Sequence, residues 1–113
     1  MSAAFSKTGQ RKTIFSAPAN TSETSAHTVP SGGVGEVLQG INIAVGTAAN
    51  ISVRVNDGST DWYLLDTYSQ AANTTETYTF GEVFLEPGWI VKVTTSTANE
   101  AVFAITVEQV FQG

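Results

Sequence analysis

The sequence predicts an all-β protein: a single antiparallel β-sandwich, jelly-roll-like, with an extended N-terminal arm. Apolar and polar residues alternate with a period of two over much of residues 34 to 111, which is the pattern of half-buried strands. Turn-forming residues separate these runs at intervals of roughly 8–12 residues, as in sandwiches and barrels. Polarity comes largely from 16 Thr and 10 Ser, which favour strands and turns over helices.

The chain of 113 residues fits one domain. Residues 17 to 33, "APANTSETSAHTVPSGG", contain hardly an apolar anchor before Val29 and therefore predict an extended segment. We accordingly divide the chain into an extended N-terminal arm and linker, residues 1 to 33, and a β-sandwich domain, residues 34 to 113. Within the arm, "KTIFS" (residues 12 to 16) is the stretch suited to form a strand, because it carries β-branched and aromatic residues.

The first strands of the domain are expected over residues 41 to 45 and 51 to 55, where Ile and Val alternate with small or polar residues. "NDGSTD" (residues 56 to 61) contains an Asp-Gly pair between apolar runs and predicts a hairpin turn. "WYLLDTY" follows as a third strand and "SQAANTTE" as the next turn. The strand that contains Tyr78 and Phe80 continues past Gly81, which indicates a bulge.

The last strands are separated by two further turns. Pro87-Gly88 supplies a fixed φ followed by tolerance of positive φ, as a tight turn requires, and "TSTANE" turns the chain again. Residues 89 to 93 and 103 to 107 each place one apolar row inward. The predicted core includes Ile43, Ile51, Val53, Val91, Val93, Phe103 and Ile105.

The net charge of −5 is unevenly distributed. Lys7, Arg11 and Lys12 lie in the first 22 residues, which contain no acid, whereas ten acidic residues face two basic ones from Glu23 onward, a net charge of −8. An acidic body disfavours binding to nucleic acid. No apolar run approaches the ~20 residues of a membrane span, and the N-terminus lacks the apolar stretch of a signal peptide. We therefore expect neither a nucleic-acid nor a membrane partner.

The side chains available for catalysis or metal binding are few. The chain has no cysteine, and its one histidine, His27, lies in the low-complexity segment. Asp57 and Asp61 could coordinate calcium, but their spacing lacks the fuller ligand set of a dedicated loop, so a plain hairpin is the preferred interpretation. We predict no catalytic residue, no metal, no cofactor and no enzymatic activity, and we expect that replacing His27 by Ala leaves function unchanged.

The large aromatic residues raise the question of a contact surface. Trp62 and Tyr63 open one strand and Trp89 opens another. Neighbours along a strand point to opposite faces, so Trp62 and Tyr63 cannot both be core residues. Three interpretations stay open for these aromatics: caps on the ends of the core, a subunit contact, or a platform for a ligand such as a sugar.

The C-terminal half, "FLEPGWIVKVTTSTANEAVFAITVEQV", resembles a family of small β-sandwich proteins found in the virions of tailed bacteriophages. The upstream run "INIAVGTAANISVRVNDGSTDWYLLD" resembles the same family, so the resemblance covers roughly residues 34 to 110. It rests on turn chemistry rather than on a site. The chain departs from the pattern at Trp89, where such proteins more often carry a polar residue after Pro-Gly.

The resemblance implies a structural role on the capsid surface of a virion. The leading hypothesis is a capsid decoration (cement) protein, a homotrimer on a three-fold or quasi-three-fold position, that clamps subunits of the major capsid protein. The alternatives are a phage tail or fibre module and a carbohydrate-binding receptor-recognition domain.

For the arm, we predict that residues 1 to 22 order only on contact with a neighbour, by strand addition. The expected contacts there are Lys7, Arg11, Lys12, Ile14 and Phe15.

Overall fold

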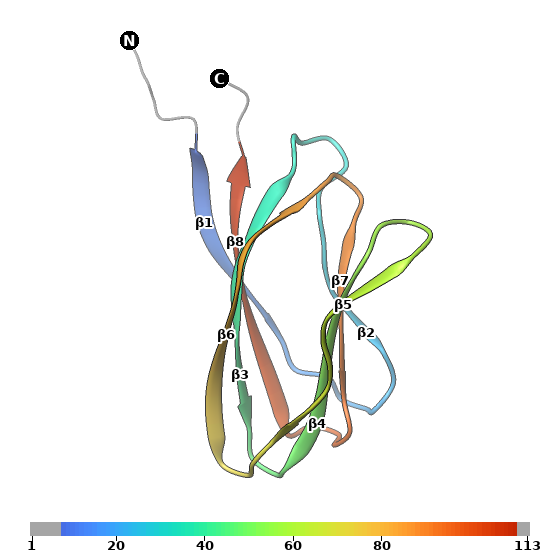
Figure 1. The fold of residues 1–113 in the computed structure, drawn as a ribbon, viewed down its shortest axis with the longest axis vertical. Helices are drawn as coiled ribbons and strands as arrows, with labels where there is room; N and C mark the ends of the chain where they lie inside the picture. Colours follow the sequence, from blue (N-terminus) through green and yellow to red (C-terminus); the bar gives the residue numbers. More distant parts are fainter. Residues whose placement is uncertain (1–7, 111–113) are drawn as a thin grey trace.

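A computed structural model describes residues 8 to 110, which form eight strands and no helix (Figure 1). In chain order the strands are β1 (Thr8–Ser16), β2 (Thr24–Thr28), β3 (Glu36–Val45), β4 (Ala49–Asn56), β5 (Asp61–Gln70), β6 (Thr74–Leu85), β7 (Ile90–Thr95) and β8 (Ala101–Val110). Accordingly, no helix in this part of the chain is long and apolar enough to cross a membrane.

The strands form two antiparallel four-stranded sheets, in the orders β1-β8-β3-β6 and β2-β7-β4-β5. Each sheet thus takes strands alternately from the beginning and the end of the chain, which is the arrangement of a jelly roll. Figure 1 shows the two sheets packed side by side, with β1, β8, β3 and β6 on the left. The predicted all-β antiparallel sandwich is therefore confirmed.

Residues 8 to 33 are not an arm separate from the domain, contrary to the sequence-based division. β1 pairs with β8 from Arg11↔Glu108 to Ser16↔Phe103, and β2 pairs with β7. The prediction that residues 1 to 22 order only on a neighbour is thus wrong for β1, which adds to a sheet of its own chain. Two apolar side chains explain this outcome, since Ile14 packs on the core and Val29 is 1% exposed.

The turns confirm the local chemistry read from the sequence. Gly58, in the Asp-Gly pair, has φ 102°, and the Asp57 N–H donates to the Thr60 carbonyl at 3.1 Å. Gly88 has φ 89° in the Pro-Gly turn. Gly81 has φ 70° where the register between β3 and β6 shifts, so the predicted bulge is also present. Each of these glycines adopts a left-handed conformation that a side chain would strain.

The core fills the space between the two sheets. All the residues predicted from the two-residue alternation are buried there, which confirms the assignment of the inward face. Val29, Leu85 of β6 and further apolar residues of β3, β4 and β8 complete the core. The outward faces of the two sheets are therefore the surfaces available for function.

Candidate interaction surfaces

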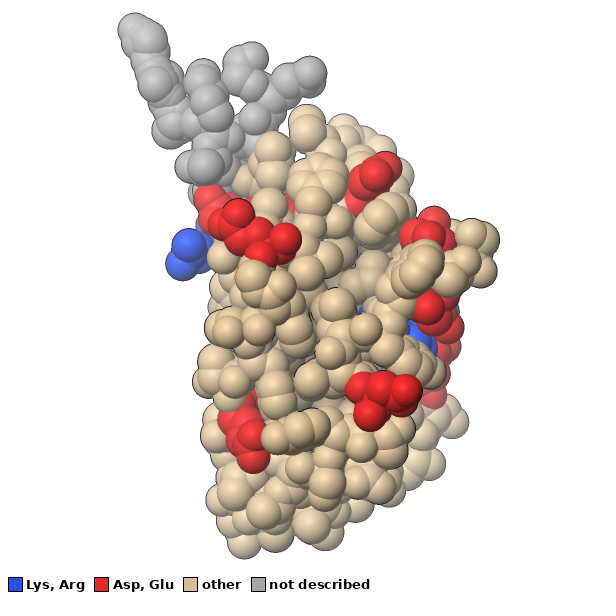
Figure 2. Space-filling view, in the orientation of Figure 1, with Lys and Arg blue, Asp and Glu red and all other residues tan. Residues whose placement is uncertain are grey.

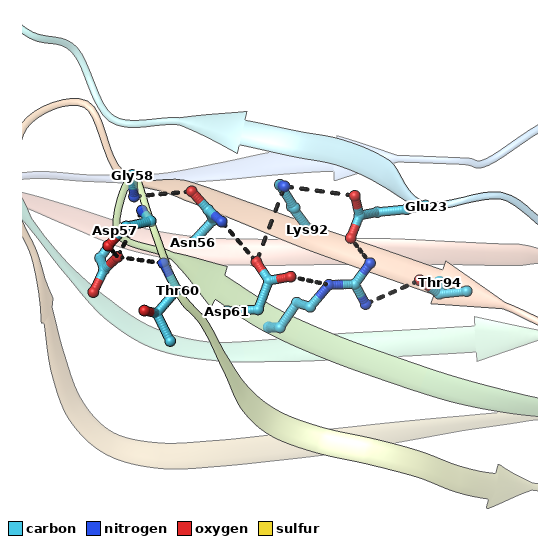
Figure 3. Close-up of polar contacts among 10 residues, drawn as sticks. Glu23, Asn56, Asp57, Gly58, Thr60, Asp61, Lys92 and Thr94 are labelled. Carbon is cyan, nitrogen blue, oxygen red and sulfur yellow. Dashed lines mark hydrogen bonds and ion pairs between the residues drawn. The ribbon is translucent and has the colours of Figure 1, made fainter.

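Asp57 organises the tip of the β4–β5 hairpin and holds an exposed tryptophan in place. Its Oδ1 accepts the backbone N–H groups of Ser59 at 3.0 Å and Thr60 at 2.8 Å. Its Oδ2 accepts the indole N–H of Trp62 at 2.9 Å, although the Trp62 side chain is 58% exposed. Figure 3 shows Asp57 turned toward the hairpin backbone and Thr60. The indole ring is therefore fixed in orientation while its surface stays accessible.

These bonds lower the pKa of Asp57 to about 2, first through the Trp62 indole and then through the Thr60 and Ser59 amides. A carboxyl whose pKa is lowered on folding stabilises the hairpin above its ordinary pKa of 3.8, and the stabilisation is lost as pH falls toward about 2. We expect the NMR signal of the Trp62 indole N–H to titrate with a midpoint near pH 2. A midpoint near 3.8 would show that the indole bond is absent in solution, and Asp57→Asn should abolish the transition.

A cluster of four charges lies on the outer face of the sheet β2-β7-β4-β5 (Figure 3). Arg54 on β4 and Lys92 on β7 lie opposite each other, and both pair with Glu23 and Asp61. Lys92 Nζ lies 3.5 Å from Glu23 Oε1, and Arg54 Nε lies 3.6 Å from Asp61 Oδ2. Two cations side by side would repel each other, and the two carboxylates neutralise them.

Further contacts hold Arg54, which is 7% exposed, in this cluster. Its Nη1 donates to Thr94 Oγ1 at 3.2 Å, and its guanidinium lies 5.5 Å from the centroid of the Tyr63 ring, a cation–π arrangement. Asp61 is turned to these cations and Asp57 to the hairpin backbone, so the two carboxylates do not converge on a shared calcium position. Within residues 8 to 110 no group of three or more His, Asp and Glu could hold a metal ion.

The predicted contact residues of the arm lie in different environments in the structure. Arg11 pairs with Glu108 at 3.6 Å and Lys12 with Glu36 at 3.5 Å, so the described basic residues are already engaged within the chain. Ile14 points inward and packs on the core. Phe15 is 71% exposed on the outer face. Lys7 lies outside the described residues.

The outer face of the sheet β1-β8-β3-β6 differs sharply from the charged cluster. Following the register across the strands, three neighbouring rows carry no charged residue. We call these rows the uncharged face. The first row is Val102, Ala44 and Thr75, the second is Phe15, Ala104, Asn42 and Thr77, and the third is Thr13, Thr106, Gly40 and Thr79. Phe15 and Val102 are its large exposed apolar side chains. In Figure 2 the acidic side chains form separate groups on a mostly uncharged surface, so charge is not spread evenly.

A buried carboxylate that the sequence did not single out lies between the sheets. Glu36 at the start of β3 is 1% exposed, and its Oε1 lies 2.6 Å from Nε2 of His27 on β2. Its Oε2 makes no hydrogen bond to any residue from 8 to 110 and has Lys12 as its ion-pair partner. His27 thus lies in strand β2 with its side chain only 10% exposed, and its predicted place in an extended segment outside the domain is corrected. Glu36 also lines a hollow of ≈ 150 Å³ with Val29, Val34 and Val110.

The large aromatics divide between surface and core. Trp62 and Tyr63 are 58% and 52% exposed, so neither is a core residue, whereas Trp89 is partly buried against the core. Trp62 pairs with Val55 and so lies on the inward phase of β5, yet it is exposed at the hairpin end. Burial alone does not assign a ligand or a subunit contact to these residues, and both roles remain predictions.

No known family model matches the chain, and no curated protein matches it in sequence. The structure aligns with that of a pentameric capsid protein isolated from metagenomic phage sequences, with a TM-score of 0.45 and 20% sequence identity. The alignment covers 87% of this chain and 60% of that protein, so the chain spans less than two thirds of the length of the protein it resembles.

Proposed function

We propose that this chain is a non-enzymatic structural protein of a bacteriophage virion, a capsid decoration (cement) protein that binds and stabilises the shell from its surface. The observation that carries the proposal is the uncharged face. A monomeric acidic protein gains solubility from charges on its exposed sheets. Three neighbouring outward rows built mostly from Thr, Ala, Gly and Asn, with Phe15 exposed at 71% and Val102 at 41%, are instead suited to being covered by another protein.

The fold and the sequence resemblance support the same role. The jelly roll is an architecture of viral capsid and lectin domains, an analogy that acts at the level of the fold. The stretches that resemble virion proteins of tailed phages run from β3 to β8 and so include most strands of the uncharged face. Together they favour a virion protein over other β-sandwich binding modules.

The partners follow from this role. We propose that the major capsid protein contacts the uncharged face and that copies assemble as trimers on three-fold or quasi-three-fold positions. Arg11 and Lys12 have partners in their own chain, so the contact at β1 depends on Phe15 and the strand rather than on basic charge. The virion surface is the corresponding location.

The test is binding to phage shells, with a charge placed at the centre of the uncharged face. Ala104→Arg should weaken co-sedimentation with shells at least about tenfold, because a desolvated, unpaired guanidinium is costly in an interface. Thr28→Arg, at an exposed position on the other sheet, is the matched control and should bind normally. Unchanged binding by the folded Ala104→Arg variant would refute the proposed face, and a cryo-EM map of the particle would show whether the protein occupies shell or tail.

A carbohydrate-binding role is the second candidate, and the fixed, exposed indole of Trp62 is the observation that favours it. A rigid aromatic ring can stack on a sugar with little loss of conformational entropy. Glycan-array binding that disappears in Trp62→Ala and survives in Tyr68→Ala would support this alternative. Binding to shells that is unaffected by Trp62→Ala would favour the decoration role.

A further inference from the structure

The two sheets leave four edge strands: β1 and β6 in one sheet, β2 and β5 in the other. An edge strand presents unpaired backbone groups that can pair with another chain, and proteins commonly blunt such edges with short strands or bulges. β2 has 5 residues and a register shift, and β5 is irregular against β4 with Thr67 at φ 55°. β6 is interrupted at Gly81. Three edges are therefore protected.

β1 lacks this protection over its second half. From Arg11 to Ser16 it pairs residue by residue with β8, without a register shift. In the part of the chain that the structure describes, no strand lies on its other side. Every second residue of this segment must point its N–H and C=O away from β8, since hydrogen bonding in an antiparallel pair alternates. The free edge of β1 is therefore regular and open.

The charges around this edge indicate the kind of partner. Each copy carries a net charge of −5, so two copies repel each other over most of their surface. β1 lies in the part of the chain that contains no acid, and its described basic side chains are paired with Glu108 and Glu36. The edge thus offers main-chain groups and an exposed aromatic ring to a partner, with no acidic side chain of its own strand to oppose a second copy.

We propose that β1 of one chain pairs antiparallel with β1 of a second copy across a two-fold axis centred on Thr13. The exposed residues Arg11, Thr13 and Phe15 share one face of the strand. This register places Arg11 opposite the partner subunit's Phe15, twice, so that each guanidinium can lie over a ring. A register centred on Lys12 would instead place two lysines opposite each other, which is unfavourable. The pairing joins the two outer faces into one continuous surface.

This inference rests on the proposed function in one respect. On a shell, the pairing of two β1 strands connects copies that belong to adjacent trimers. The pairing itself is a property of the purified chain and needs no shell. Its tests therefore use protein alone, and shell binding is measured separately. A wild-type chain that binds shells but does not self-associate in solution would count against the pairing and not against the decoration role.

The first experiment measures mass by sedimentation velocity at tens of micromolar. Thr13 is exposed, so Thr13→Lys should leave the fold intact while placing two lysines opposite each other at the axis. We expect the wild-type particle to have twice the mass of Thr13→Lys and twice that of Thr13→Glu, and an equimolar mixture of the two variants to recover the doubled mass. Thr79→Lys, at an exposed position on β6, is the matched control and should keep the wild-type mass.

The second experiment uses the absence of cysteine from the chain. Thr13→Cys should form a covalent dimer under mild oxidation, because directly opposite residues of an antiparallel pair have Cα atoms about 4.5–5.5 Å apart, within disulfide range. Thr79→Cys is the control. Cross-linking of both variants at the same rate, or a wild-type mass that Thr13→Lys leaves unchanged, would overturn the proposal. If Thr13→Lys instead abolishes only shell binding, the edge serves the shell and the second copy is the wrong occupant.

Discussion

Replacing Phe103 by Ala is expected to lower the free energy of unfolding by about 3–5 kcal/mol. Phe103 is 0% exposed and is the largest of the fully buried side chains. It lies on β8 between Ser16 of β1 and Ile43 of β3, so its ring is enclosed by paired strands that cannot easily collapse into the space it leaves. Domains of this size have a total stability of about 5–15 kcal/mol, so the loss should be a large part of the whole.

The measurement is urea unfolding followed by tryptophan fluorescence, with the slope against urea checked for constancy. Val102→Ala is the matched control, because Val102 is the preceding residue of the same strand and is 41% exposed on the opposite face. It should cost less than about 1 kcal/mol, as surface substitutions usually do. A small loss for Phe103→Ala and a large one for Val102→Ala would mean that the inward and outward faces of β8 are assigned the wrong way round.

The period-two pattern predicted the core because each inward row repeats without interruption. Val93 follows Lys92 and Ile105 follows Ala104, and Val91 and Phe103 continue the same two buried rows, so the inward face could be assigned from the period alone. The turns were predictable for a similar reason, since Asp-Gly and Pro-Gly have strong local preferences that the tertiary structure did not override.

The first 33 residues were misjudged because their anchors are sparse. Ile14 and Val29 lie far apart among polar residues, and no local window shows a repeat. Their burial depends on β8 and β7, which come from the other end of the chain. A topology that pairs the first strand with the last is a long-range property, and period and composition do not reveal it.

The candidate surfaces were predictable in part. Trp62 and Tyr63 are neighbours on one strand, so the sequence predicted that at least one of them is exposed. The hydrogen bond from the Trp62 indole N–H to Asp57 could not be predicted, because it depends on the shape of the hairpin. The uncharged face could have been noticed as Thr and Ala on the outward phase of several strands, although which strands share a sheet was unknown. Glu36 offered a local signal, since it lies on the same phase as the buried Leu38.

Replacing His27 by Ala is expected to destabilise the protein by about 3 kcal/mol, because a buried carboxylate loses its hydrogen-bond partner. Glu36 is 1% exposed and cannot turn to solvent when the contact of 2.6 Å is removed. Lys12 lies 3.5 Å from the other oxygen and is 40% exposed, so it compensates only partly. Thr28→Ala, at the exposed neighbouring position on β2, is the control and should have little effect.

The double variant His27→Leu/Glu36→Leu should recover most of that loss and lie within about 1 kcal/mol of the wild type. Replacing both partners by apolar side chains of similar size removes the desolvation cost of the carboxylate along with the bond that offsets it. Lys12 then keeps its access to water. A double-mutant cycle with His27→Leu and Glu36→Leu as the single variants measures the coupling, which we expect to be about 2 kcal/mol. Strictly additive losses would mean that His27 and Glu36 are neighbours without an energetic link, and the predicted loss for His27→Ala could not then be attributed to the Glu36 carboxylate.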